Sequence, residues 1–190
     1  MPPTPEQTRE AHFRGLYAEH YDAVSRFVRR RGSPSDVDDI VAETFLVAWR
    51  RLEDVPTGPG EALPWLYAVA RNCLLNAARS HVRQHSLAVK VADHEPTALS
   101  DRAFDEGAAA DDRVDLANAW RQLSPEDQEV LGLALFEDLT STAAARVIGT
   151  SPSAYRLRLS RARRRLRALL SPATATPLHA VAPAAIKELT

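Results

Sequence analysis

The chain has 190 residues, 45% of them hydrophobic and 26% charged, so it can form one medium or two small folded domains and is not largely disordered. Its single cysteine excludes an internal disulfide framework and favours a reducing cytoplasm. The formal net charge is only -1, although residues 155–170 are rich in arginine and contain no acid, so negative charge must be concentrated elsewhere.

Apolar residues recur every three or four positions and glycine is scarce, which predicts an all-helical fold. The first helix is expected over residues 11–31, with Gly32 as its stop. The second is expected over residues 33–52, with Ser33 as its N-terminal cap.

A loop with two prolines and two glycines follows, over residues 53–62. Pro64 then starts a third helix, which is expected to reach about residue 83. Residues 85–111 are acidic, alanine-rich and without sustained periodicity, so we expect a flexible linker between two domains.

A second helical domain is predicted over residues 112–170, followed by a proline- and alanine-rich tail over residues 171–190. Its first helix offers Val114 and Trp120, among others, for packing. Its helices are expected over residues 112–123, 125–136, 140–148 and 152–170.

The last two of these helices, joined through Gly149, have the spacing of a helix-turn-helix, whose second helix enters the major groove of DNA. An apolar stripe should face the domain core, formed by Tyr155, Leu159, Ala162 and Leu166. The opposite face would then point toward DNA, with Ser153, Arg156, Leu157, Ser160, Arg161 and Arg164. A solvated basic helix or a coiled-coil partner is the alternative.

The second helix has a wide apolar stripe, and its other face exposes aliphatic side chains among charges. Exposed aliphatic residues on such a face indicate a protein-docking surface, although scattered ones alone are a weak signal. The residues of this face are Ala42, Glu43, Leu46, Val47 and Arg50.

Three consecutive blocks, residues 13–32, 36–52 and 63–79, resemble region 2 of bacterial RNA polymerase sigma factors of the sigma-70 family, extracytoplasmic-function type. Residues 116–170 are similar to region 4 of the same proteins. The resemblance implies a region 2 helical bundle over residues 11–84 and a region 4 helix-turn-helix domain over residues 112–170. The protein would then be an alternative sigma factor that directs promoter-specific transcription initiation.

The resemblance also implies roles for individual residues. The second helix would dock on the clamp helices of the largest polymerase subunit through Asp39, Glu43, Leu46 and Arg50. The loop of residues 53–62 would capture an unstacked base of the minus-ten element. The third helix would lie along that element with Arg71, Asn72, Asn76, Arg79 and Arg83, and the basic helix would read the minus-35 element.

The implied partners are the RNA polymerase core and promoter DNA, with an anti-sigma factor as a further candidate. No secretion signal or membrane-spanning segment is evident, so a cytoplasmic protein without membrane insertion is expected. The chain departs from the family pattern at Ala42, at Ala143 and Ala144, and near Ser153. These departures bear on which minus-35 sequence is read, not on the fold.

No enzyme activity, cofactor or metal is expected, because the six histidines are scattered and no cysteine pair or phosphate-binding glycine loop is present. Two other classes of protein remain open. A stand-alone helix-turn-helix regulator would bind its operator without polymerase. A structural helical adaptor would show no salt-sensitive DNA binding.

Overall fold

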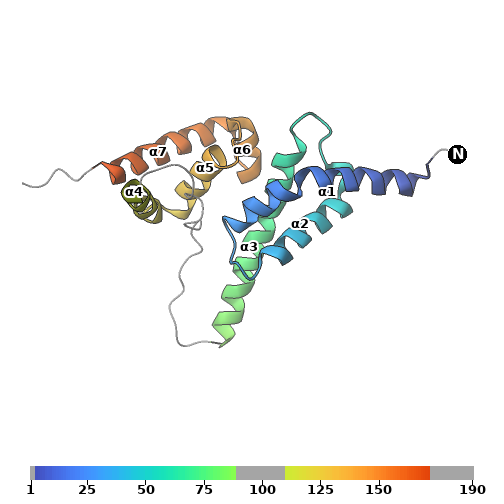
Figure 1. Cartoon of the computed structure of the whole chain (residues 1–190), viewed down its shortest axis with the longest axis horizontal. Helices are drawn as coiled ribbons and strands as arrows, with labels where there is room; N and C mark the ends of the chain where they lie inside the picture. Colours follow the sequence, from blue (N-terminus) through green and yellow to red (C-terminus); the bar gives the residue numbers. More distant parts are fainter. Residues whose placement is uncertain (1–2, 89–109, 172–190) are drawn as a thin grey trace, which may run out of the picture.

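The computed structural model describes residues 3–88 and 110–171 (Figure 1). Within these ranges every regular element is helical and no strand occurs, which confirms the all-helical prediction. The predicted linker is helical as far as Ala88, and its residues 89–109 lie outside the described part, as do tail residues 172–190. The elements are α1 (Pro5–Arg29), α2 (Val37–Arg50), the 3-10 turn η1 (Leu52–Asp54), α3 (Ala62–Ala88), α4 (Ala110–Arg121), α5 (Pro125–Leu135), α6 (Ser141–Ile148) and α7 (Pro152–Leu170).

The first three helices pack into one bundle, in which α3 contacts both α1 and α2 (Figure 1). Its core joins aliphatic and aromatic side chains, and the rings of Phe27 and Tyr67 stack with centroids 4.5 Å apart. Thr44 is fully buried, and its hydroxyl donates to the Ile40 carbonyl at 2.7 Å, so this polar group does not cost the core an unmade hydrogen bond. We call these three helices the region 2 module, after the sigma factor region that their sequence resembles.

Helix α1 begins earlier than the sequence pattern indicated. The expected start was residue 11, whereas the helix begins at Pro5. A capping box explains the difference, because the Thr4 hydroxyl accepts from the Gln7 amide at 3.2 Å and the Gln7 side chain accepts from the Thr4 amide at 2.8 Å. This first turn is exposed, so no apolar periodicity marked it.

Helix α2 begins later than predicted, and the expected cap at Ser33 is wrong. The N-cap is Asp36, without a side-chain capping bond, and Ser33 lies in the preceding turn with its hydroxyl 2.9 Å from that of Ser35. Gly32 lies in the turn after α1, where the chain passes close to α3. A Cβ atom there would meet Leu74 Cδ2 at 3.1 Å, so close packing favours glycine at this position.

The remaining helices form a second unit around Trp120, which is fully buried in α4; we call α4–α7 the region 4 module. The Tyr155 hydroxyl donates to the Val130 carbonyl at 2.9 Å and ties α7 to α5. Burial raises the pKa of this tyrosine, which therefore stays a neutral donor. Val114 was expected to pack but is 58% exposed, because α4 turns only its C-terminal half toward the core.

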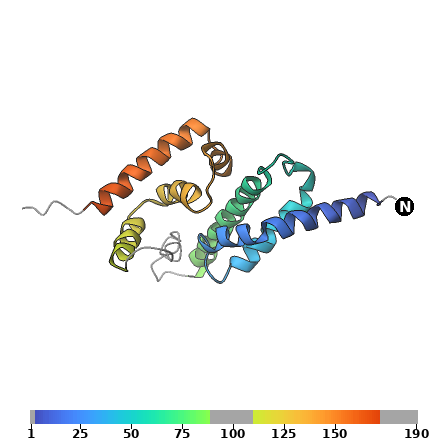
Figure 2. The same cartoon turned by 45° about the horizontal axis from the view of Figure 1, so that its top comes forward.

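The two modules are in contact, and the views in Figures 1 and 2 both place α6 beside α3. Buried apolar residues of both modules belong to one continuous cluster. None of the described helices is both long enough and apolar enough to span a lipid bilayer.

Candidate nucleic-acid interface

The turn between α6 and α7 has the backbone that a helix-turn-helix requires. Gly149 ends α6 with φ 68°, a left-handed conformation that glycine adopts without steric cost. The hydroxyls of Thr140 and Ser151 cap the two helices by accepting from the amides of Ala143 and Ala154. The expected end of α6 at Gly149 and the expected start of α7 at residue 152 are thus confirmed.

Helix α7 separates its faces as predicted. Its 19 residues make a rod of roughly 28 Å at 1.5 Å per residue, long enough to cross a DNA groove. On the inner side Tyr155, Leu159 and Ala162 are buried, and Leu166 is half-buried. All six residues expected to face DNA are exposed: Ser153, Arg156, Leu157, Ser160, Arg161 and Arg164.

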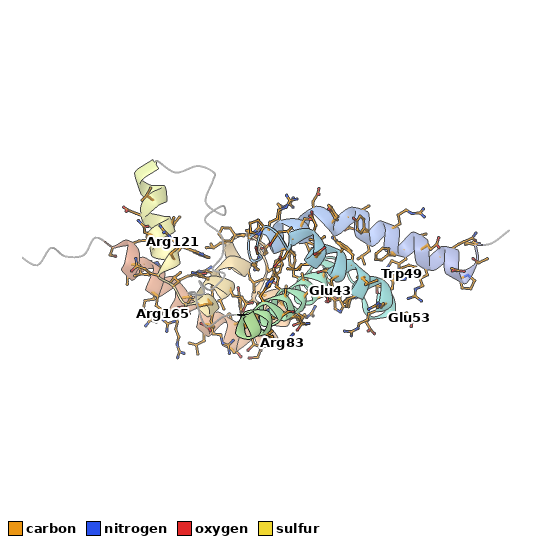
Figure 3. The ribbon with its side chains drawn as sticks, turned by 90° about the horizontal axis from the view of Figure 1, so that it is seen from below. Glu43, Trp49, Glu53, Arg83, Arg121 and Arg165 are labelled. Atoms are coloured by element: carbon orange, nitrogen blue, oxygen red, sulfur yellow. The ribbon has the colours of Figure 1, made fainter. Side chains whose placement is uncertain are left out.

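One arginine of α7 has a structural partner that the sequence did not indicate. Arg165 Nη1 donates to both carboxylate oxygens of Asp127 in α5, at 2.8 and 2.6 Å. Asp127 is buried, whereas the Arg165 side chain remains 61% exposed at the protein surface (Figure 3). Arg165 therefore holds the basic helix against its module and is not a simple addition to the DNA-facing charge.

Four of the five residues predicted to lie along the minus-ten element share one exposed stripe of α3. Their spacing of four, three and four residues keeps them on the same helix face. They are Asn72, Asn76, Arg79 and Arg83, the last labelled in Figure 3. Within this stripe Arg79 Nη1 donates to Asn76 Oδ1 at 3.3 Å, so the amide is oriented by its neighbour.

Arg71, the fifth residue, lies differently. It is half-buried, and its Nε and Nη2 donate to the two carboxylate oxygens of Glu129 in α5, at 2.5 and 3.1 Å. In this arrangement a carboxylate of the region 4 module occupies the guanidinium group of Arg71. The structure therefore does not present Arg71 together with the other four residues.

The loop predicted to capture a base begins with η1 and contains a left-handed residue, Gly60, with φ 72°. Glu61 at its end accepts from Arg146 Nη1 of α6 at 2.9 Å. This side of the loop therefore faces the region 4 module. Arg51 lies over the Trp65 ring, 5.9 Å from its centroid, at the base of the loop.

The predicted docking residues of α2 also form one exposed stripe. Asp39, Glu43, Leu46 and Arg50 are all exposed at the same four-three-four spacing, with Leu46 45% exposed. Glu43 is labelled on this helix in Figure 3. Val47, expected beside them, is half-buried instead.

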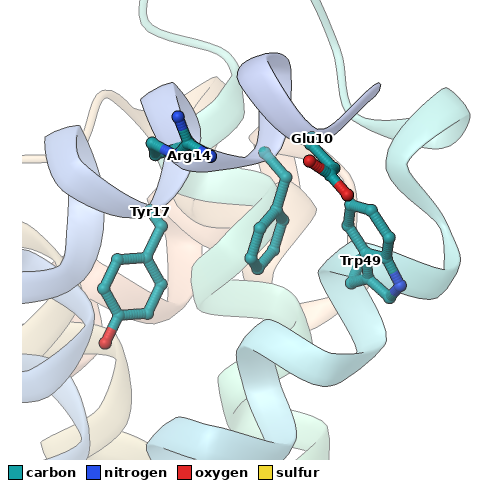
Figure 4. A pocket seen from close by; sticks show the side chains of 5 residues that line it. Glu10, Arg14, Tyr17 and Trp49 are labelled. Atoms are coloured by element: carbon teal, nitrogen blue, oxygen red, sulfur yellow. The ribbon is translucent and has the colours of Figure 1, made fainter. Parts of the chain in front are cut away.

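Sequence reasoning missed an open aromatic groove between α1 and the end of α2 (Figure 4). It has a volume of ≈ 470 Å³ and is lined by Glu10, Phe13, Arg14, Tyr17 and Trp49. The Phe13 and Trp49 rings meet edge to face at 5.2 Å. The only sequence signal was the four-residue spacing of Phe13 and Tyr17, which equally predicts a buried stripe.

No group of three or more histidine, cysteine or acidic side chains positioned for a metal occurs in residues 3–88 and 110–171. Helices α3 and α7 expose arginine and amide or hydroxyl groups that can bind DNA. Helix α2 exposes a stripe of aliphatic and charged side chains that can bind a protein.

Comparison with known proteins agrees with this pattern. The family model for Sigma-70 region 2 matches residues 16–84, and that for Sigma-70, region 4 matches residues 113–166. The RNA polymerase sigma factor NccH of Alcaligenes xylosoxydans xylosoxydans is 32% identical over 161 residues, which cover 83% of this chain and 86% of that protein. The ECF RNA polymerase sigma factor SigL of Mycobacterium tuberculosis is 32% identical over 158 residues, with 83% and 88% covered.

A solved structure also shares the fold. It is the sigma factor RpoE of Bartonella quintana, determined in complex with the anti-sigma factor NepR. The TM-score is 0.61 at 24% sequence identity, and the match covers 83% of this chain and 96% of that one.

Proposed function

This chain belongs to the extracytoplasmic-function group of the sigma-70 family, and from that premise we propose how its two modules divide the work of promoter recognition. The protein is a sigma factor, which directs promoter-specific transcription initiation by RNA polymerase and is not itself catalytic. The region 4 module reads the minus-35 element, and the region 2 module binds the polymerase core and the minus-ten element.

The observation that carries this division is the presence of three separate exposed stripes. One is the arginine and serine face of α7, another is the amide and arginine stripe of α3, and the last is the mixed stripe of α2. The first two suit DNA, because arginine and asparagine donate to phosphates and base edges. The third suits a protein, because an exposed leucine stands among charges of both signs.

The energetics of DNA opening explain why a partner is needed. Each stacked step of duplex DNA costs about 1.4 kcal/mol to open, whereas one captured base returns about 1–3 kcal/mol. A small helical module therefore cannot hold several melted pairs alone. The polymerase core contributes the remaining stabilisation and the chemistry, while this chain selects the site.

We further propose that the protein acts in the cytoplasm, where RNA polymerase core is available, and that an anti-sigma factor is among its partners. The support is the sigma factor fold shared with a protein crystallised with an anti-sigma factor. The aromatic groove of Phe13, Tyr17 and Trp49 is an apolar surface of the region 2 module that such a partner could cover.

Run-off transcription with purified core polymerase on a promoter library tests the proposal. The full chain should make the core initiate at a defined subset of promoters. Core that initiates no differently with and without the chain would contradict the assignment. A gel shift separates the rival function, because a stand-alone regulator would bind its site equally well without core.

A substitution in the exposed stripe of α2 tests whether this stripe binds the polymerase core. Leu46→Asp places a charge in the middle of the stripe and should abolish association with core, measured by co-elution, because a desolvated unpaired carboxylate is costly at an interface. Val114→Asp is the matched control, since it adds the same charge at an exposed apolar residue of α4. Retained association of the Leu46 variant would remove this face from the docking surface.

A further inference from the structure

An exposed leucine lies in the middle of the face of α7 that points away from its module. Leu157 is 52% exposed, whereas Tyr155 and Leu159, two positions before and after it, are buried. At about 100° per residue, Leu157 stands almost diametrically opposite the buried stripe of this helix. The packing of the module therefore leaves this apolar side chain in water.

The side chains around Leu157 are polar or cationic. Ser153 lies one turn before it and Arg161 one turn after it, and Arg156 and Ser160 flank it on the same face. All four are exposed. A leucine in contact with water carries a free-energy cost that a serine or an arginine at the same position does not. A ligand that covers this face can recover that cost if it brings an apolar group to Leu157.

Leu157 also lies in the part of the helix that meets base edges. It is the sixth residue of α7, counted from Pro152, and so falls in the first two turns of a 19-residue helix. In helix-turn-helix proteins the N-terminal residues of the second helix contact base edges in the major groove. Contacts to phosphates position the protein but carry no direct sequence information. Leu157 is therefore placed to contact a base.

A leucine side chain can recognise only one feature of a base pair. It neither donates nor accepts hydrogen bonds, so it cannot pair with the ring nitrogens, carbonyl oxygens or amino groups that bases display in the major groove. The apolar group displayed there is the C5-methyl group of thymine. A guanine oxygen or a cytosine amino group against the leucine would lose water without gaining a hydrogen bond. Contact with Leu157 therefore favours thymine and disfavours a G·C pair.

We propose that Leu157 is a specificity-determining residue, which selects a thymine in the minus-35 element by contact with its C5-methyl group. The inference rests on the proposed function, because α7 must enter the major groove at that element. The selected thymine lies between the groups that Ser153 and Arg161 contact. The arginines of this face supply attraction to phosphate or guanine, and Leu157 adds the preference at one base pair.

A protein partner is the other possible occupant of an exposed leucine, and the surrounding charge favours DNA. Helix α7 contains no acidic residue over Pro152–Leu170, and Arg156, Arg161 and Arg164 are exposed on the same face as Leu157. Charge of one sign attracts a polyanion. The exposed stripe of α2, which we assign to a protein, instead has charges of both signs around its leucine.

The test compares bases that differ by a single methyl group. The full chain, bound to core polymerase, first selects a minus-35 sequence from a promoter library. Each thymine of that element is then replaced in turn by uracil, which lacks only the methyl group, and competition fluorescence anisotropy measures the affinity of the holoenzyme. At one position uracil should weaken binding roughly fourfold, the effect of one buried methyl group.

Leu157→Ala should bind thymine and uracil equally well at that position, and alanine is a strong helix former that suits an exposed site of α7. Cytosine and 5-methylcytosine, placed there in turn, differ by the same methyl group. Wild type should prefer the methylated base, and Leu157→Ala should not. Leu135→Ala is the matched control, because it truncates a leucine of α5 that is 54% exposed and should keep the full methyl preference.

Two outcomes overturn the inference: an element in which no thymine methyl group affects wild-type binding, or a methyl effect that persists unchanged in Leu157→Ala. The first is read from wild type alone, so it decides even if no variant folds. A Leu157 variant that loses association with core, while thymine and uracil remain equivalent for wild type, would assign the leucine to a protein contact. Failure of the proposed function looks different, because core would then select no promoter at all with the chain present.

Discussion

At the residue scale, Arg156 and Arg165 show that one helix uses its arginines for two purposes. Arg156 is exposed on the face opposite the buried stripe, whereas Arg165 is bound to Asp127 of α5. Helical periodicity was enough to predict the position of Arg156, because the buried stripe fixes the rotation of α7. It could not reveal the partner of Arg165, because that depends on where α5 packs.

We expect Arg156→Ala to weaken promoter binding without unfolding the chain. Loss of one phosphate contact should reduce the slope of log affinity against log salt by roughly 0.9. Fluorescence anisotropy across a salt series measures the slope, and thermal melting checks the fold. Arg165→Ala is the comparison variant: it should lower the melting temperature with a smaller change in slope, and the reverse pattern would contradict the assignment.

At the element scale, helix ends were harder to predict than helix faces. The expected bounds of α7, residues 152–170, match the structure, and α6 ends at Gly149 as expected, because glycine there adopts the left-handed conformation that stops the helix. The start of α1 was missed since its first turn is polar, and the start of α2 was placed too early because Ser33 and Pro34 mimic a cap and first turn. A serine and a proline in a short turn look the same in the sequence as a true helix start. Which of the two they form depends on how the neighbouring helices pack.

The helix-turn-helix depends on the left-handed residue between its helices, which gives a paired prediction. Gly149→Ala should destabilise the protein by about 1–2 kcal/mol, because a Cβ atom is strained at φ 68° even though no other atom crowds it. Gly15→Ala, within α1 and equally uncrowded, should instead stabilise it by about 0.5–1 kcal/mol. Urea titration of both variants measures these changes, and equal effects would rule out the conformational explanation.

At the scale of the whole molecule, the sequence predicted two helical modules but not their contact. The acids and arginines that join them lie 58 to 107 positions apart in the chain, and each reads in isolation as an ordinary surface charge. Arg71 illustrates the limit, because its helix position was predicted whereas its engagement by Glu129 was not. Pairing between distant surface charges leaves no periodic signal.

The same contact gives a pH dependence. Burial, followed by the charge of Glu137, raises the pKa of Tyr67 well above its ordinary value of about 10. The folded state therefore resists ionisation of this phenol, so its contribution to stability is complete below about pH 10 and is lost as the pH rises toward the folded pKa. Tyr67→Phe should show a shallower loss of unfolding free energy above about pH 10 than wild type.

Denaturant titrations at several alkaline pH values, followed by circular dichroism, measure that loss. Tyr17→Phe, which removes the hydroxyl of an exposed tyrosine, is the matched control. Identical pH profiles for the Tyr67 variant and wild type would show that the phenol is not shielded by the contact.

The grip of Glu129 on Arg71 also bears on how the protein searches a genome. Any stray phosphate that approaches this arginine competes with a carboxylate attached to the same chain, which is present at a high effective concentration and never diffuses away. Random DNA offers phosphate charge but neither a melted strand nor a bound polymerase. Replacing Glu129 by one of its phosphates as the partner of Arg71 therefore adds little binding free energy. Non-specific binding to DNA is therefore weakened before the protein reaches a promoter.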